Sequence, residues 1–195
     1  MKIIHCADLH LDARMTANLP SDLAKKRRRE LLQTFLRMVD YAAEEDVKAI
    51  LISGDLFDRK QITVTAANTV LDAVRSHPEI IFFYITGNHE RNGFLEMIQE
   101  LPENLKLFGE TWRTYEAGPV TVTGIDRGPD MDPGVYASLV PDPSCFNIVM
   151  LHGQLTEYAA AGQYESIPLR ELRGKPIDNL PTPWDENTGT EEKVS

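Results

Sequence analysis

Four short segments of the sequence place side chains that commonly bind metals directly after an apolar run. They are Asp8-Leu9-His10, Gly54-Asp55-Leu56-Phe57-Asp58, Gly87-Asn88-His89-Glu90 and Leu151-His152-Gly153. Each apolar run has the composition of a β-strand, and the ligands of open α/β sheets gather at the carboxyl ends of strands. Carboxylates, amide oxygens and imidazoles bind divalent cations, and a pair of such cations can cleave phosphoesters. The four segments therefore predict a two-metal site for phosphoester chemistry.

The spacing within the first two segments indicates how they could share metals. Asp8 and His10 are two residues apart, and at a strand end this spacing puts both side chains on one side of the chain. Asp55 follows Gly54, which permits a tight turn and a close approach of the backbone. Because a carboxylate has two oxygens, we expect Asp55 to be able to bridge two metals.

The other candidate residues have complementary roles. Asn88 offers a metal an amide oxygen, and His152 offers a ring nitrogen. His89 is adjacent to Asn88, so its side chain points in a different direction; we expect it to face the substrate and to assist the leaving group. Asp58 is the candidate partner that fixes the tautomer of a histidine. Each segment alone could be incidental or a simple turn, so the prediction depends on the ordered set of four.

The elements that position these segments alternate between strand and helix in the first half of the chain. Strands are expected at 2–7, 49–53 and 80–86, and helices at 21–45, 63–76 and about 94–101. The second half reads mostly as strands, at 105–108, 112–116, 120–125 and 146–151, with a loop at 126–145. This pattern predicts an α/β fold with two packed β-sheets flanked by helices.

Composition limits the possible classes of protein. The chain has 195 residues, of which 42% are hydrophobic and 26% charged, as in an ordinary globular protein with one sizeable core. We expect one domain over residues 1–177 and a poorly ordered tail over 178–195, where proline and acidic residues replace any apolar periodicity. With two cysteines, no signal peptide and no apolar run of ~18 residues, a cytoplasmic protein is expected.

Charge along the chain is uneven. The formal net charge is −10, yet Lys25-Lys26-Arg27-Arg28-Arg29 is an uninterrupted run of five cations. One interpretation is a solvated helix face, and the other is a contact with the phosphate backbone of a nucleic acid. The sequence leaves both open.

The ordered motifs resemble those of the calcineurin-like metallophosphoesterases, and residues 4–12 and 52–58 look like the DNA repair exonucleases related to bacterial SbcD. The similarity covers about residues 1–177. It implies a four-layer α/β/β/α sandwich of two mixed sheets flanked by helices, with two metals at one edge. It also implies manganese as the usual metal, DNA ends as the substrate and, in the full-length family, an SbcC-type ATPase partner.

The resemblance also implies a role for each motif residue. The first metal is held by residues that match Asp8, His10 and Asp55, and the second by Asp55, Asn88 and His152. The residue that matches His89 is the catalytic histidine.

In one respect the sequence departs from the family. The family has a later Gly-His-x-His motif whose histidines complete both metal shells, whereas this sequence has no histidine after His152. Residues 174–178 look like the approach to that motif, so we expect a C-terminally truncated domain that lacks its last strands. Three functions remain open: a DNA exonuclease, a phosphatase or phosphodiesterase of small phosphoesters, and a truncated non-catalytic fragment.

Overall fold

The computed structural model describes residues 1–15, 19–58, 62–87, 93–126, 133–157 and 166–181. The chain divides into two compact units, Met1–Lys106 and Leu107–Ser195, and each unit is described by itself. Among the described residues, no helix is both long enough and apolar enough to cross a membrane.

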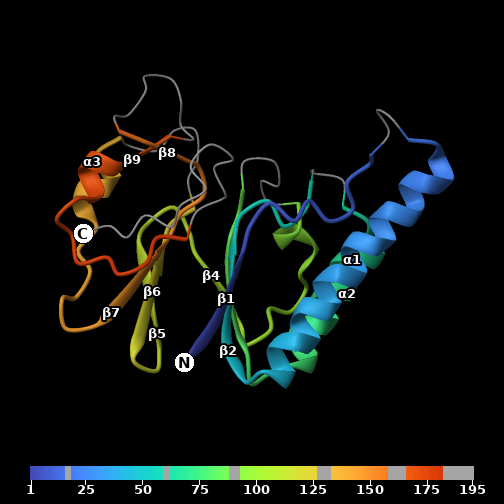
Figure 1. The fold of residues 1–195 in the computed structure, drawn as a ribbon, viewed down its shortest axis with the longest axis horizontal. Helices are drawn as coiled ribbons and strands as arrows, with labels where there is room; N and C mark the ends of the chain where they lie inside the picture. The colour runs from blue at the N-terminus through green and yellow to red at the C-terminus, as the bar shows by residue number, and fades with distance from the viewer. Residues whose placement is uncertain (16–18, 59–61, 88–92, 127–132, 158–165, 182–195) are drawn as a thin grey trace. The chain divides into compact units, whose positions relative to one another are not determined.

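The first unit is a four-stranded sheet with two long helices. Its elements are β1 (Lys2–Cys6), α1 (Ser21–Glu44), β2 (Val47–Ser53), α2 (Val64–Ser76), β3 (Ile81–Ile85), the short 3-10 helix η1 (Leu95–Met97) and β4 (Leu105–Leu107). The strand order is β1-β2-β3-β4, and β1, β2 and β3 are parallel. Figure 1 shows α1 and α2 side by side along this sheet. Parallel strands joined by helices bring their carboxyl ends to one edge, so the segments that follow β1, β2 and β3 meet there.

The apolar patterns explain why these elements form. Strand β2 is buried at every position except Lys48, as expected for a central strand covered on both faces. Helix α1 buries one stripe, made of Ala24, Phe35, Val39 and Ala42. At the start of α2, the Thr63 side chain accepts a hydrogen bond from the backbone N–H of Ala66 at 3.2 Å, which satisfies a donor that the first turn leaves unpaired.

The second unit contains a mixed sheet. Its elements are β5 (Arg113–Ala117), β6 (Val120–Gly124), the 3-10 helix η2 (Pro133–Ser138), β7 (Phe146–Met150), β8 (Gln154–Thr156), β9 (Ser166–Pro168) and α3 (Leu169–Leu172). Strands β5 and β6 are antiparallel, whereas β6 and β7 are parallel. Strands β8 and β9 form a separate parallel pair.

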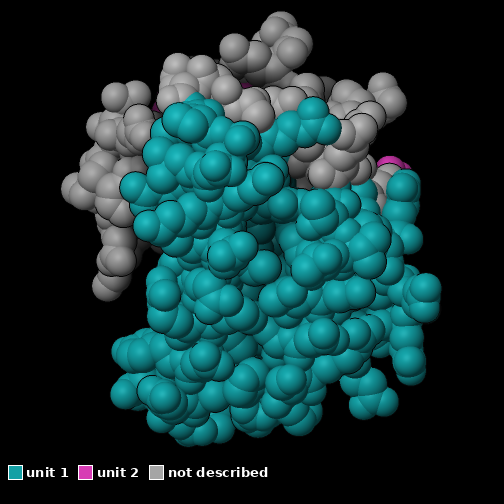
Figure 2. All heavy atoms as spheres, turned by 90° about the vertical axis from the view of Figure 1, so that its right-hand side faces the viewer, with its two compact units in different colours: residues 1–106 teal, residues 107–195 magenta. Residues whose placement is uncertain are grey.

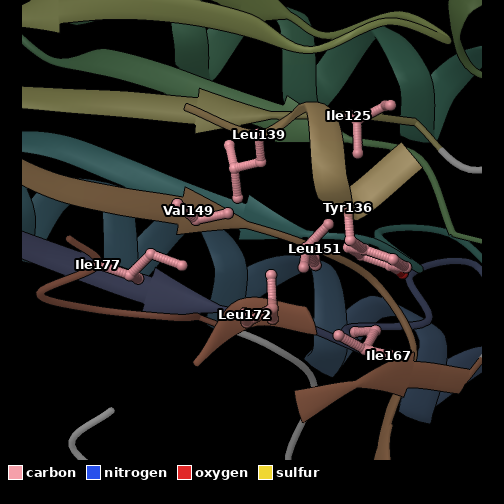
Figure 3. Packing of buried hydrophobic residues seen from close by; sticks show 8 residues of the cluster. All are labelled: Ile125, Tyr136, Leu139, Val149, Leu151, Ile167, Leu172 and Ile177. Carbon is pink, nitrogen blue, oxygen red and sulfur yellow. The ribbon is translucent and has the colours of Figure 1, made fainter. Parts of the chain in front are cut away.

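The core of the second unit joins several short elements. Figure 3 shows this cluster, which consists of Ile125, Tyr136, Leu139, Val149, Leu151, Ile167, Leu172 and Ile177. Trp112 packs against the cluster, and its indole N–H donates to the carbonyl oxygen of Val135 at 2.9 Å. The short 3-10 and α-helices thus contribute as much to this core as strand β7 does.

The α/β fold with mixed sheets flanked by helices is confirmed, but three local predictions differ from the structure. The helix expected at about 94–101 is only the three-residue η1, because Phe94 is its one fully buried apolar residue and Leu101 is 48% exposed. The loop expected at 126–145 contains η2, which buries Tyr136. The tail expected from residue 178 begins with a paired segment, since the backbone N–H of Val149 in β7 donates to the carbonyl of Asn179 at 3.0 Å.

Candidate metal site

The loops after β1 and β2 are joined to each other by backbone hydrogen bonds. Three N–H groups of the first loop donate to three successive carbonyls of the second: Asp8 to Gly54 at 3.2 Å, His10 to Asp55 at 3.0 Å and Leu11 to Leu56 at 2.8 Å. The pairing ends in a parallel bridge between Leu11 and Phe57, both of which are buried. This backbone ladder continues the β1–β2 pairing beyond the strands and fixes the first two predicted segments side by side.

Both loops use left-handed backbone at residues other than glycine. The φ angles are +52° at Asp8, +44° at His10, +61° at Asp12 and +48° at Asp55. This conformation costs free energy for residues with a Cβ, although Asp and His tolerate it better than most. Strained residues gather at functional sites, where the surrounding structure holds them in place. The concentration of four such residues in two adjoining loops therefore indicates a functional site at this end of the sheet.

The two loops bring the carboxylates of Asp8 and Asp55 together. An oxygen of each lies within 4.8 Å of the other. Asp55 is only 3% exposed, whereas Asp8 is exposed. Two carboxylates this close repel each other when both are ionised, and a divalent cation between them replaces that repulsion with attraction. The pair therefore has the donor chemistry of a site for a hard divalent cation.

Gly87, which follows β3, packs closely against Asp55. A Cβ atom placed on Gly87 would lie 1.9 Å from Oδ1 of Asp55 and 2.5 Å from its backbone nitrogen. Since real Cβ atoms do not approach other atoms so closely, only glycine fits here. The third predicted segment thus reaches the same edge as the first two. Its next residues, Asn88 and His89, lie outside the described residues.

His10 lies against Asp58. Its Nδ1 is 3.4 Å from a carboxylate oxygen of Asp58, and both side chains are half-buried. A carboxylate at Nδ1 orients the imidazole and leaves Nε2 as the nitrogen that could bind a metal. The Asp58 carboxylate is near enough to Nδ1 for the predicted role, which requires a hydrogen bond to the ring, and that role stays a prediction.

His152 belongs to the second unit. It follows β7 by two residues, so it stands at the carboxyl end of a strand that runs parallel to β6. The neighbouring Gly153 has a φ of +147°, a backbone conformation that residues with a Cβ rarely adopt. The fourth segment therefore has the strand-end position that the sequence predicts for it.

Two residues of this edge were not predicted to have a positioning role. Gly87 begins the third segment, in which the sequence predicts roles only for Asn88 and His89. Asp12 lies in the motif of residues 4–12 without a predicted role of its own, yet its carboxylate accepts a hydrogen bond from the backbone N–H of Thr63 at 2.8 Å. Thr63 is the N-cap residue of α2, so Asp12 ties the loop after β1 to the start of that helix. The only signal in the sequence was the repeat of the two-residue spacing from Asp8 through His10 to Asp12.

Cys6, at the end of β1, takes no part as a thiolate. Burial raises the pKa of its thiol to about 12, and its Sγ lies 3.5 Å from the carbonyl oxygen of Leu51. The thiol therefore stays protonated at neutral pH, and metal ligation by sulfur would require deprotonation. Oxygen and nitrogen donors remain as the chemistry of this edge.

Comparisons with known proteins identify the family of the chain. A family model described as calcineurin-like phosphoesterase matches residues 1–189. The uncharacterized metallophosphoesterase YhaO of Bacillus subtilis is 31% identical over 112 residues, which are 55% of this chain and 28% of that protein. The DNA double-strand break repair protein Mre11 of Saccharolobus solfataricus is 26% identical over 179 residues, which are 85% of this chain and 45% of that protein.

Two further matches are less similar in sequence than YhaO is. Mre11 of Methanosarcina acetivorans is 27% identical over 164 residues, 78% of this chain and 25% of that protein. A crystal structure of Pseudomonas putida nuclease MPE aligns with a TM-score of 0.37 and 17% identity, covering 83% of this chain and 65% of that one. The chain thus spans about a quarter of the length of YhaO and of the Methanosarcina Mre11.

Proposed function

Because the chain belongs to the calcineurin-like phosphoesterase family, we propose that it is a metal-dependent phosphodiesterase that cleaves DNA, of the SbcD type of exonuclease. The observation that carries the proposal is the Asp8–Asp55 pair, in which two carboxylates are held within 4.8 Å by strained and paired loops. The choice of DNA is supported by the relatives that are named DNA double-strand break repair proteins. The motifs at residues 4–12 and 52–58 favour the same substrate.

Five residues would hold two divalent cations, for which we propose manganese. Asp8, His10 and Asp55 would bind the first, and Asp55, Asn88 and His152 the second. When bound, such a pair activates water and neutralises the phosphoryl group. Asp55 suits the shared position because it is the buried member of the carboxylate pair and is enclosed by Gly87.

Two further side chains, those of Asp58 and His89, would assist the metal ligands and the hydrolysis. Asp58 would keep the ring of His10 oriented, as their 3.4 Å contact allows. His89 would donate a proton to the leaving oxygen of the substrate. The family resemblance further supports an SbcC-type ATPase as a partner of the whole protein, and the two free cysteines support a reducing cytoplasm as its location.

The test separates metal binding from hydrolysis. We expect manganese-dependent release of nucleotides from an end-labelled duplex, and we expect His89→Ala to abolish it while the manganese affinity, measured by calorimetry, stays near wild type. His77→Ala is the matched control, since His77 caps the far end of α2 beside Glu79; it should change neither quantity.

Three other results would contradict the proposal, and each would favour a different role or function. If His89→Ala loses manganese as severely as His152→Ala does, then His89 is a ligand and not a proton donor. Hydrolysis of bis-p-nitrophenyl phosphate without any release from DNA would favour an enzyme of small phosphoesters. A chain that binds no manganese would be a non-catalytic fragment.

A further inference from the structure

The first turns of α1 carry the run of five cations at residues 25–29 in a chain whose net charge is −10. Two of the five form ion pairs with one carboxylate, that of Glu30. Arg27 lies 2.8 Å from a carboxylate oxygen of Glu30, and Lys26 lies 3.9 Å from the other oxygen of the same residue. These two cations are therefore explained by ion pairs within the helix.

The other three cations have no ion pair among the described residues of the chain. They are Lys25, Arg28 and Arg29. Because residues three and four apart are neighbours on a helix, Arg28 and Arg29 both lie beside Lys25. Lys25 and Arg29 are exposed, and Arg28 is half-buried. The three side chains form one cationic stripe, distinct from the Lys26–Arg27–Glu30 group.

This stripe does not help α1 to fold. Like charges three and four residues apart destabilise a helix, and Lys25 has this spacing to both Arg28 and Arg29. Asp22 is the one acidic residue of the first turn, and it forms no ion pair with the stripe. A stripe that costs the helix stability is better explained by a ligand of opposite charge than by the solvation of a helix face.

The fold puts the stripe at the same end of the first unit as the metal-type residues. Helix α1 runs opposite to β1 and β2, so its N-terminus lies toward the edge at which β1, β2 and β3 end, as Figure 1 shows. Figure 2 looks onto the side of the unit on which α1 and α2 lie. A long polyanion that reaches Asp8 and Asp55 can therefore continue along the start of α1.

We propose that Lys25, Arg28 and Arg29 bind backbone phosphates of the DNA substrate, away from the phosphodiester that is cleaved. The inference rests on the proposed function and names the surface that holds its substrate. Phosphate contacts of this kind position a nucleic acid without reading its sequence, and each contact releases counterions. The surface should therefore contribute affinity that falls steeply with salt and has no sequence preference.

The test compares two neutralised variants of the full chain, K25Q/R28Q/R29Q and the matched control K26Q/R27Q. Binding to a fluorescent 30-base-pair duplex is measured without manganese, in EDTA, over a range of salt concentrations. At ~0.9 counterions released per phosphate contact, the triple variant should lose about 2.7 from the slope of log K against log salt. Its affinity at about 0.1 M salt should fall at least tenfold. The control should change the slope by less than ~1.

Hydrolysis of bis-p-nitrophenyl phosphate separates this proposal from the proposed function. The triple variant should keep the wild-type rate, because so small a diester cannot reach the stripe. If the wild-type chain cleaves diesters but both variants bind the duplex alike, the surface is wrong and the proposed function stands. If the stripe sets the salt slope but no diester is cleaved, the proposed function is wrong and the surface stands.

Discussion

Asp55 in the first unit and Asn147 in the second are both buried polar residues, 3% and 1% exposed, but their surroundings differ. Asn147 lies in β7 with every side-chain group satisfied: its Oδ1 accepts from the hydroxyl of Thr121 at 2.7 Å, and its Nδ2 donates to the carbonyls of Asp142 and Cys145 at 2.7 and 3.1 Å. Asp55 has a left-handed backbone, a second carboxylate within 4.8 Å and no room for any side chain at Gly87.

The difference separates two uses of a buried polar group. A fully hydrogen-bonded amide such as Asn147 stabilises and specifies the fold. A pair of carboxylates under backbone strain costs stability unless a cation joins it. Substitutions at Asn147 should therefore change the free energy of unfolding, and substitutions around Asp55 should mainly change metal affinity.

Among the variants that keep every proposed metal ligand, the largest effect is expected for Gly87→Ala. The new methyl group would collide with Oδ1 and the backbone nitrogen of Asp55, so the Asp55 carboxylate must move away from Asp8. We expect a loss of ~100-fold in manganese affinity, the upper range for residues that position metal ligands. Calorimetric titration measures it. Gly109→Ala is the control, because a Cβ there meets nothing within 4 Å; equal losses in the two variants would refute a specific role of Gly87.

Asn147→Ala comes next and should act on stability. The substitution leaves the Thr121 hydroxyl and the carbonyls of Asp142 and Cys145 without their partner. We expect a loss of about 2 kcal/mol in the free energy of unfolding, measured by urea denaturation. Manganese affinity of the folded protein should stay within twofold of wild type, and a large loss of affinity would mean that the comparison with Asp55 does not hold.

The paired segment 178–181 should contribute a smaller amount. The backbone of Asp178 and Asn179 donates to the carbonyl of Asn147 at 2.9 and 3.2 Å, and the side chain of Asp178 accepts from the backbone N–H of Asn147 at 2.8 Å. Leu180 packs against the core of the second unit. A chain that ends at Ile177 should therefore lose roughly 1.5 kcal/mol of stability relative to one that ends at Pro181.

Two thermal melts test this boundary. The chain that ends at Pro181 should melt within a few degrees of the full chain, because residues 182–195 contain four acidic residues and no apolar periodicity. Equal melting temperatures for the chains that end at 177 and 181 would show that the pairing with β7 adds nothing.

The smallest effect is expected for Asp12→Ala. It removes the acceptor of the Thr63 N–H and should cost about 1 kcal/mol of stability, as the loss of a helix cap does. Because Asp12 also fixes the loop that holds Asp8 and His10, manganese affinity should fall several-fold. Asp12→Asn keeps an oxygen acceptor and should recover most of the stability and of the manganese affinity. If it recovers neither, the negative charge of Asp12 and not its hydrogen bond to Thr63 accounts for the loss.

Much of the first unit could be predicted from the sequence because its elements are long and periodic. The strand that became β2 and the helices α1 and α2 were predicted to within a few residues. The segment that follows Gly93 could not be predicted, because its helical spacing of apolar residues does not lead to burial. Phe94 is the one residue of this segment that is fully buried, and its ring centroid lies 5.0 Å from that of Phe57 and 5.9 Å from that of Tyr84.

The candidate site, like the first unit, could be predicted only in part from the sequence. Residue types and their order after strands predicted the Asp8 and Asp55 segments, and parallel topology explains why they meet. Spacing alone could not reveal that the loops use left-handed backbone, that Gly87 leaves no space beside Asp55 or that Asp12 reaches α2. These features depend on contacts between segments that are distant in the sequence, and local patterns carry no information about such contacts.

Manganese-dependent thermal stability tests most directly whether Asp8 and Asp55 form a metal site. Manganese at 100 times its dissociation constant should stabilise the wild-type chain by about 2.7 kcal/mol. Asp8→Asn should retain part of this gain and Asp55→Asn none, while metal-free Asp55→Asn should be as stable as wild type to within about 1 kcal/mol. If Asp55→Asn unfolds more readily without metal and still gains the full stabilisation from manganese, Asp55 is a structural carboxylate and the account is wrong.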